Sequence, residues 1–99
     1  MILVDAQHIS ETTILGTAEH EFVINNAILM QIFVKPATGT TTYDFSLKDV
    51  YDNVVYEETN CDGEYNQLVS VPTYGNIVFT IDNSFVDELY KIVLTFRRS

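Results

Sequence analysis

Carboxylates are the side chains of this sequence with the most potential for chemistry, because 14 Asp and Glu stand against 5 Lys and Arg among 99 residues. Two close groups fall at expected turns, Asp49 with Asp52 and Asp62 with Glu64. Calcium binds carboxylate and carbonyl oxygens on loops, so these four residues would be its ligands. However, no Asp-x-Asp-x-Asp-Gly loop is present, and acidic turn residues usually cap the backbone. We therefore expect no bound metal or cofactor.

Histidine and cysteine are too sparse for a soft-metal or redox site. His8 and His20 lack the spacing of zinc ligands, and Cys61 has no Cys or His close to it in the sequence. A single cysteine cannot form an internal disulfide. Cys61 falls in a polar turn where neighbouring acids raise a thiol pKa, so we predict an exposed and unreactive thiol.

Catalytic arrangements are also missing. The serines lack a Gly-x-Ser-x-Gly elbow, and the four glycines are scattered over separate turns rather than gathered in a phosphate loop. A glycosidase needs two carboxyls roughly 5–10 Å apart in a cleft lined by sugar-stacking aromatics. The chain has no Trp and little length for a cleft. We predict that the protein is not an enzyme.

The net charge of -9 argues against whole classes of partner. Nucleic acids and anionic membranes attract clustered Lys and Arg, and the only basic pair is Arg97-Arg98 at the C-terminal end. No segment approaches the roughly 20 apolar residues of a membrane span, and Met1 to Asp5 lacks the basic start of a signal peptide. We expect no nucleic-acid or membrane partner and folding in a cytosol.

The elements that position these side chains follow a period of two. In 41–48 the alternate residues Tyr43, Phe45 and Leu47 share one face, and 75–82 and 90–97 repeat this pattern. Turn signals separate five further strands, expected at 9–15, 21–25, 28–35, 53–58 and 66–71. The pattern predicts an all-β protein, an antiparallel β-sandwich that is jelly-roll-like with about eight strands. Residues 1–99 form a single domain, with 1–20 as an arm or edge segment.

Several apolar residues stand at positions that alternation assigns to solvent. Leu29 and Phe33 alternate with Gln31 and Lys35, and the other two are Val78 and Val93. A covering loop or N-terminal arm would explain them, and isolated exposed valines are common. If they form one patch, they mark an interface. We take these four residues as the candidate protein interface.

The spacing of apolar segments also resembles known families. Tyr43-Asp44-Phe45-Ser46-Leu47, the run 69–81 and the final strand 89–96 follow in an order similar to pre-peptidase C-terminal domains. The pattern is also similar to small β-sandwich structural proteins of tailed, often marine, bacteriophages. The phage resemblance implies a virion structural protein, most simply a capsid decoration or cement protein. It would assemble in the host cytoplasm as a homo-oligomer, or on a capsid lattice, through protein–protein contacts.

An alternative function remains open. Asp49, Asp52, Asp62 and Glu64 could serve a carbohydrate- or calcium-binding module. In that case Tyr51 or Tyr65 would provide the flat platform on which a sugar ring stacks.

Overall fold

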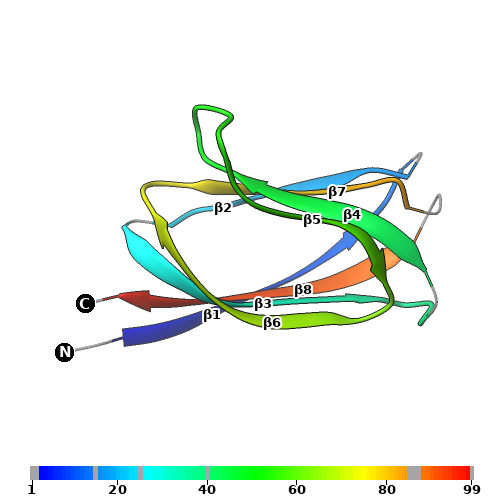
Figure 1. Ribbon diagram of the computed structural model, residues 1–99, viewed down its shortest axis with the longest axis horizontal. Coiled ribbons are helices and arrows are strands. Elements are labelled where there is room, and N and C mark those ends of the chain that lie inside the picture. The colour runs from blue at the N-terminus through cyan, green and yellow to red at the C-terminus, as the bar shows by residue number, and fades with distance from the viewer. Residues whose placement is uncertain (1–2, 15, 25, 40, 85–87, 99) are drawn as a thin grey trace.

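Eight strands form two antiparallel sheets in the computed structural model, which describes residues 3–14, 16–24, 26–39, 41–84 and 88–98 (Figure 1). The first sheet has the order β1 (Leu3–Thr12), β8 (Leu89–Arg98), β3 (Ala27–Pro36), β6 (Tyr65–Thr73). The second sheet has the order β2 (Ala18–Phe22), β7 (Ile77–Asp82), β4 (Thr42–Lys48), β5 (Val54–Asp62). This confirms the predicted antiparallel β-sandwich of about eight strands.

The core lies between the sheets and is built by the alternation seen in the sequence. Tyr43, Phe45 and Leu47 of β4 point inward against Phe79 of β7 and Phe96 of β8, and all five are buried. In β4 polar residues take the intervening positions, so this strand has one apolar and one wetter face. Burying this many aromatic and aliphatic side chains supplies the main driving force for folding.

The first two strands, β1 and β2, form sheet edges. β1 pairs along its whole length with β8, from Leu3 opposite Arg98 to Thr12 opposite Leu89, so it starts and ends earlier than the predicted strand 9–15. A tight turn follows, in which Ile14 and Thr17 pair across Gly16 at φ 82. The chain then enters β2 at the edge of the second sheet. It therefore crosses from one sheet to the other along one side of the sandwich.

A β-bulge in β3 corrects one predicted interface residue. The pairing of β3 with both β6 and β8 shifts between Leu29 and Gln31. The extra residue moves Leu29 to the inner face, where its side chain is 0% exposed, while Phe33 stays on the outer face. The prediction that Leu29 faces solvent was wrong, because a strict period of two takes no account of an inserted residue.

Candidate functional site

The edge strand β6 differs in charge from the other three edges of the sandwich. β1 and β2 carry acidic residues, as does β5, whereas no charged residue occurs between Glu64 and Asp82. β6 pairs with β3 on one side, and its other edge pairs with no strand of the described chain. Proteins usually protect such edges with charges, Pro or short length. Over its nine residues β6 has no charge, and only Pro72 and the register shift in its pairing with β3 interrupt the edge.

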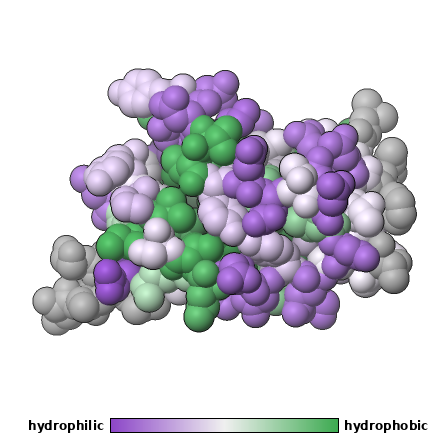
Figure 2. Space-filling view, viewed as in Figure 1, coloured by the Kyte–Doolittle hydropathy of each residue, from purple (hydrophilic) through white to green (hydrophobic). Residues whose placement is uncertain are grey.

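Apolar side chains accompany this uncharged edge. Leu68 is 76% exposed and Val54 is also exposed, while Val55, Val69 and Val71 are half-buried against the core. We call these five residues the β5–β6 band. Figure 2 shows apolar surface gathered where β5 and the C-terminal half of β6 face the viewer in Figure 1. A contiguous apolar surface on an otherwise acidic chain is typical of a protein interface.

An aromatic cluster supports the crossing from β5 to β6. The ring of Phe45 stacks on Phe79 and Tyr56 and meets Tyr65 edge-on, with centroid distances of 5.3, 6.1 and 5.0 Å respectively. The hydroxyls of Tyr56 and Tyr65 share a hydrogen bond of 2.6 Å, and burial raises the pKa of Tyr65. Its hydroxyl therefore stays protonated and the two strands are held at a fixed spacing.

The remaining sequence-derived interface candidates lie on opposite sides of the molecule. Phe33 and Val93 are direct cross-strand neighbours on the outer face of the first sheet, and both are half-buried. Val78 lies on the outer face of the second sheet, opposite Glu21 and Lys48. With Leu29 in the core, these residues do not form one patch. The adjacent apolar pairs Val54-Val55 and Leu68-Val69 break the period of two, but the β5–β6 band was missed because only the strand order shows that β5 and β6 are sheet edges.

Cys61 is buried rather than exposed, which corrects the prediction of a turn thiol. It lies in β5 opposite Tyr43 and belongs to the hydrophobic core, with 9% of its surface exposed. The sequence around it resembles a turn, but the strand continues to Asp62 and the turn comes at Gly63. Burial, together with the nearby carboxylates of Glu58 and Asp44, raises the pKa of the thiol to about 11. Such a thiol is inert.

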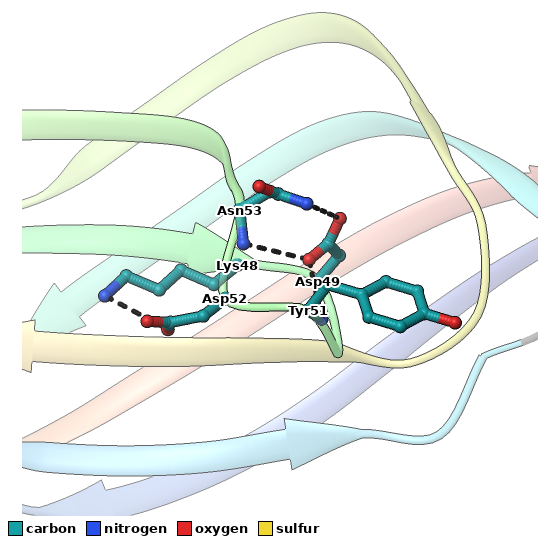
Figure 3. A network of polar contacts seen from close by, with 5 residues as sticks. All are labelled: Lys48, Asp49, Tyr51, Asp52 and Asn53. Carbon is teal, nitrogen blue, oxygen red and sulfur yellow. Dashed lines mark hydrogen bonds and ion pairs between the residues drawn. The ribbon is translucent and has the colours of Figure 1, made fainter.

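Asp49 has a structural role in the β4–β5 turn. Its Oδ1 accepts the backbone N–H groups of Tyr51 and Asn53, each at 2.9 Å, and its Oδ2 accepts the amide of Asn53 at 3.2 Å (Figure 3). The N–H of Asn53 holds the pKa of Asp49 below its usual value. Asp52 pairs with Lys48 at 3.5 Å. These contacts cap the turn and occupy the oxygens that a cation would need.

The other two candidate calcium ligands lie at the opposite end of the same hairpin. Thr42 is opposite Asp62, whereas Lys48 is opposite Val54, so Asp62 and Glu64 are separated from Asp49 by the length of β4. Within the described ranges, no group of three or more His, Cys, Asp or Glu could hold a metal ion. The two candidate sugar platforms also differ, because Tyr51 is exposed at the turn and Tyr65 packs on Phe45.

The two histidines lie in separate environments. His20 Nδ1 lies 2.9 Å from Glu11 Oε1, a contact that links β2 to β1 across the side of the sandwich. His8 lies on the outer face of the first sheet, in a shallow hollow that Phe33, Lys91 and Val93 also line. Neither arrangement resembles a zinc site. In the part of the chain that the structure describes, no helix is long and apolar enough to span a membrane.

Comparison with solved structures places the fold among known sandwiches. One similar chain comes from work described as "Bacillus endospore appendages form a novel family of disulfide-linked pili"; it has a TM-score of 0.67 and 20% identity, covering 99% of this chain and 88% of that one. Another, "Carbohydrate-Binding Module CBM36 in complex with calcium and xylotriose", has a TM-score of 0.42 and 9% identity, covering 95% and 88%. No protein-family model and no curated protein matches the sequence. The first likeness shows that the two-sheet fold is shared.

Proposed function

We propose that this chain is a structural protein that assembles with further copies of itself through contacts along β6 and the β5–β6 band. The observation that supports this most strongly is the contrast between β6, which carries no charge, and the three acidic edges. An edge strand can add a strand from another chain by backbone hydrogen bonds, and flanking apolar side chains give that contact affinity. The likeness to a pilus chain supports the structural class.

The contacts between copies are non-covalent in this proposal. The similar pilus chain belongs to a disulfide-linked family, but this chain has a single cysteine, which is buried in β5. Two folded copies cannot bring their Cys61 sulfurs together without opening the core. A reductant should therefore leave the assemblies intact. A capsid decoration protein is one form of this function, and a filament subunit is another.

The carbohydrate- or calcium-binding alternative has less support. Tyr65 packs inward against Phe45, and the carboxylate of Asp49 is committed to its own turn. Tyr51 remains as an exposed aromatic, next to an Asp49 carboxylate that its own turn uses.

Light scattering of the purified chain tests the proposal. We expect the particle mass to rise above that of the 11.3 kDa monomer as the concentration increases. Leu68→Lys places a charge on the exposed edge strand, as natural edges do, and should lower the particle mass at each concentration by removing the contact along β6. The substitution is at an exposed position, so the folding stability should change by less than about 0.5 kcal/mol.

Val23→Lys provides the matched control. Val23 is 75% exposed, nearly the same as Leu68, but it follows β2 and lies outside the β5–β6 band. This variant should assemble like the unmodified chain. A chain that stays monomeric at every concentration, or a Leu68→Lys variant that assembles normally, would contradict the proposal.

A further inference from the structure

The outer face of the first sheet is basic although the protein as a whole is acidic. Lys35 of β3 and Lys91 of β8 are exposed and directly opposite each other, and Arg97 lies farther along β8. On β1, the edge strand that pairs with β8, the outward positions hold Ala6, His8, Ser10 and Thr12. Among the side chains described on this face, none is acidic.

The outer face of the second sheet has the opposite charge. Its outward positions carry acidic side chains from all four strands: Glu19, Glu21, Asp44, Glu57 and Asp82. Lys48 is the one outward base among the residues described there. The sandwich therefore separates its charges, with positive charge on one broad face and negative charge on the other.

Both faces place like charges next to each other. Lys35 is the cross-strand partner of Lys91, and Asp44 is the cross-strand partner of Asp82. Like charges directly opposite on neighbouring strands destabilise a sheet. Neither lysine forms an ion pair with any described residue. The arrangement costs the isolated subunit stability, and a surface of opposite charge would offset that cost.

Two hydrogen bonds fix the orientation of the Asp44 carboxylate on the acidic face. Its Oδ1 accepts the N–H of Asn60 at 2.8 Å, and its Oδ2 accepts the amide of Asn83 at 2.6 Å. These donors fix its orientation beside Asp82, which in turn accepts the hydroxyl of Thr17 at 2.9 Å. The carboxylates of Asp44 and Asp82 are therefore held in fixed orientations on the acidic face.

We infer that the basic outer face of the first sheet in one copy docks on the acidic outer face of the second sheet in the next copy. The inference deepens the proposed function, since it specifies a second contact between the same copies. With a net charge of -9, two copies repel on average, so this face-to-face orientation is the one in which their charges attract. Phe33 and Val93 on one face and Val78 on the other supply apolar contact.

This contact joins two different surfaces, so each copy keeps one free face of each kind. Contacts of this type produce rings or open filaments rather than closed dimers. A standard interface needs roughly 800 Å² per partner. A four-stranded face on a molecule 41 Å long can provide most of that area.

Sedimentation velocity with two charge-reversed variants tests the inference. K35E/K91E makes the basic face acidic, and E19K/E21K offsets the negative charge of the acidic face, leaving Asp44, Glu57 and Asp82 against three lysines. All four positions are exposed, so both variants should fold. Each variant alone should self-associate at least tenfold more weakly than the unmodified chain at low salt. An equal mixture of the two should associate again, because the unaltered acidic face of K35E/K91E then meets the unaltered basic face of E19K/E21K.

Salt and Leu68→Lys separate this contact from the edge contact. About 1 M salt shortens electrostatic range to roughly 3 Å and should weaken the face contact while sparing the apolar β5–β6 band. Leu68→Lys adds positive charge to the basic face, so it should break only the edge contact. If K35E/K91E assembles like the unmodified chain, the face contact is overturned while the edge proposal stands. If the mixture fails to associate, or soluble polyglutamate binds the basic face while copies do not bind each other, a second copy is not its occupant.

Discussion

The sandwich has two long sides, one with the edge strands β1 and β2 and one with the edge strands β5 and β6, and different contacts stabilise the two sides. On the β1–β2 side, polar groups secure the crossing: His20 contacts Glu11, and the N–H of Thr13 donates to the carbonyl of Glu88 at 2.8 Å. On the β5–β6 side, the rings of Phe45, Tyr56 and Tyr65 pack together under an apolar surface. One side satisfies its own polar groups within the subunit. The other leaves apolar surface that a neighbouring subunit can cover.

Buried Glu88 lies where the end of β1, the start of β8 and the β3–β4 connection meet, and polar partners from the end of β1 and from that connection satisfy it. Its Oε2 accepts the hydroxyl of Thr41 at 2.6 Å, its Oε1 accepts the N–H of Thr38 at 3.1 Å, and its own N–H donates to Thr13 Oγ1 at 2.9 Å. A buried carboxylate is tolerated only with such partners. The comparison teaches that polar side chains paired within the subunit leave little for a neighbour to contact, whereas the aromatic packing of the β5–β6 side leaves apolar surface available.

Phe45→Ala should have the largest effect, because it removes the ring at the centre of the β5–β6 crossing. Loss of a buried Phe side chain costs about 3–5 kcal/mol. Urea unfolding followed by circular dichroism measures the change in the free energy of unfolding. Phe45→Leu keeps most of the volume and should cost clearly less. Equal losses for both variants would show that the aromatic contacts do not stabilise this side.

Alkaline pH should weaken the same side through Cys61. Burial raises the thiol pKa from an ordinary 9.0 to about 11, so the folded chain holds this proton more tightly than the unfolded chain. The stabilisation is complete below pH 9 and is lost as the pH rises through 11. Its size is on the order of 2 kcal/mol, since one pKa unit corresponds to about 1.4 kcal/mol.

Cys61→Ala isolates that contribution from the tyrosines, which also titrate at high pH. Burial raises the pKa of Tyr43, and both chains lose stability on this account. Unfolding free energies measured at pH 9 and pH 11 should fall further for the unmodified chain than for Cys61→Ala. Parallel curves for the two chains would contradict the burial of the thiol.

Glu11→Gln should have the smallest effect. It removes the charge of the contact with His20 on the β1–β2 side, where both side chains are about one-third exposed. Ion pairs of this exposure contribute about 0–1 kcal/mol. Thermal unfolding should show a correspondingly small shift. A loss as large as that from Phe45→Ala would mean that the two sides do not differ as described.

Sequence periodicity was sufficient to predict the fold class, an antiparallel β-sandwich. Tyr43, Phe45 and Leu47 alternate with polar residues, and this pattern is enough to identify a half-buried strand. Leu29 shows its limit, because a bulge is an insertion in the pairing and leaves no trace in hydropathy. Cys61 shows another, since polar neighbours that suggest a turn can occupy the outer positions of a strand end.

The candidate interface depended on pairing that the sequence does not specify. Lys35 and Lys91 are far apart in the chain, and only the strand order β8-β3 puts them side by side. Similarly, the absence of charge in β6 gains meaning only once β6 is known to be an edge. Strand identity is a local property, whereas sheet order depends on long-range packing.

Hydrogen–deuterium exchange in dilute and concentrated samples tests the central claim most directly, because it locates the contact between copies. If copies join along β6, the amides of β6 (Tyr65–Thr73) should exchange more slowly in the concentrated sample, as backbone groups at its free edge become paired. The amides of β2 (Ala18–Phe22), an edge strand with two glutamates, should exchange at the same rate in both. Slower exchange in β2 alone, or unchanged exchange in β6 while the particle mass rises, would contradict the account.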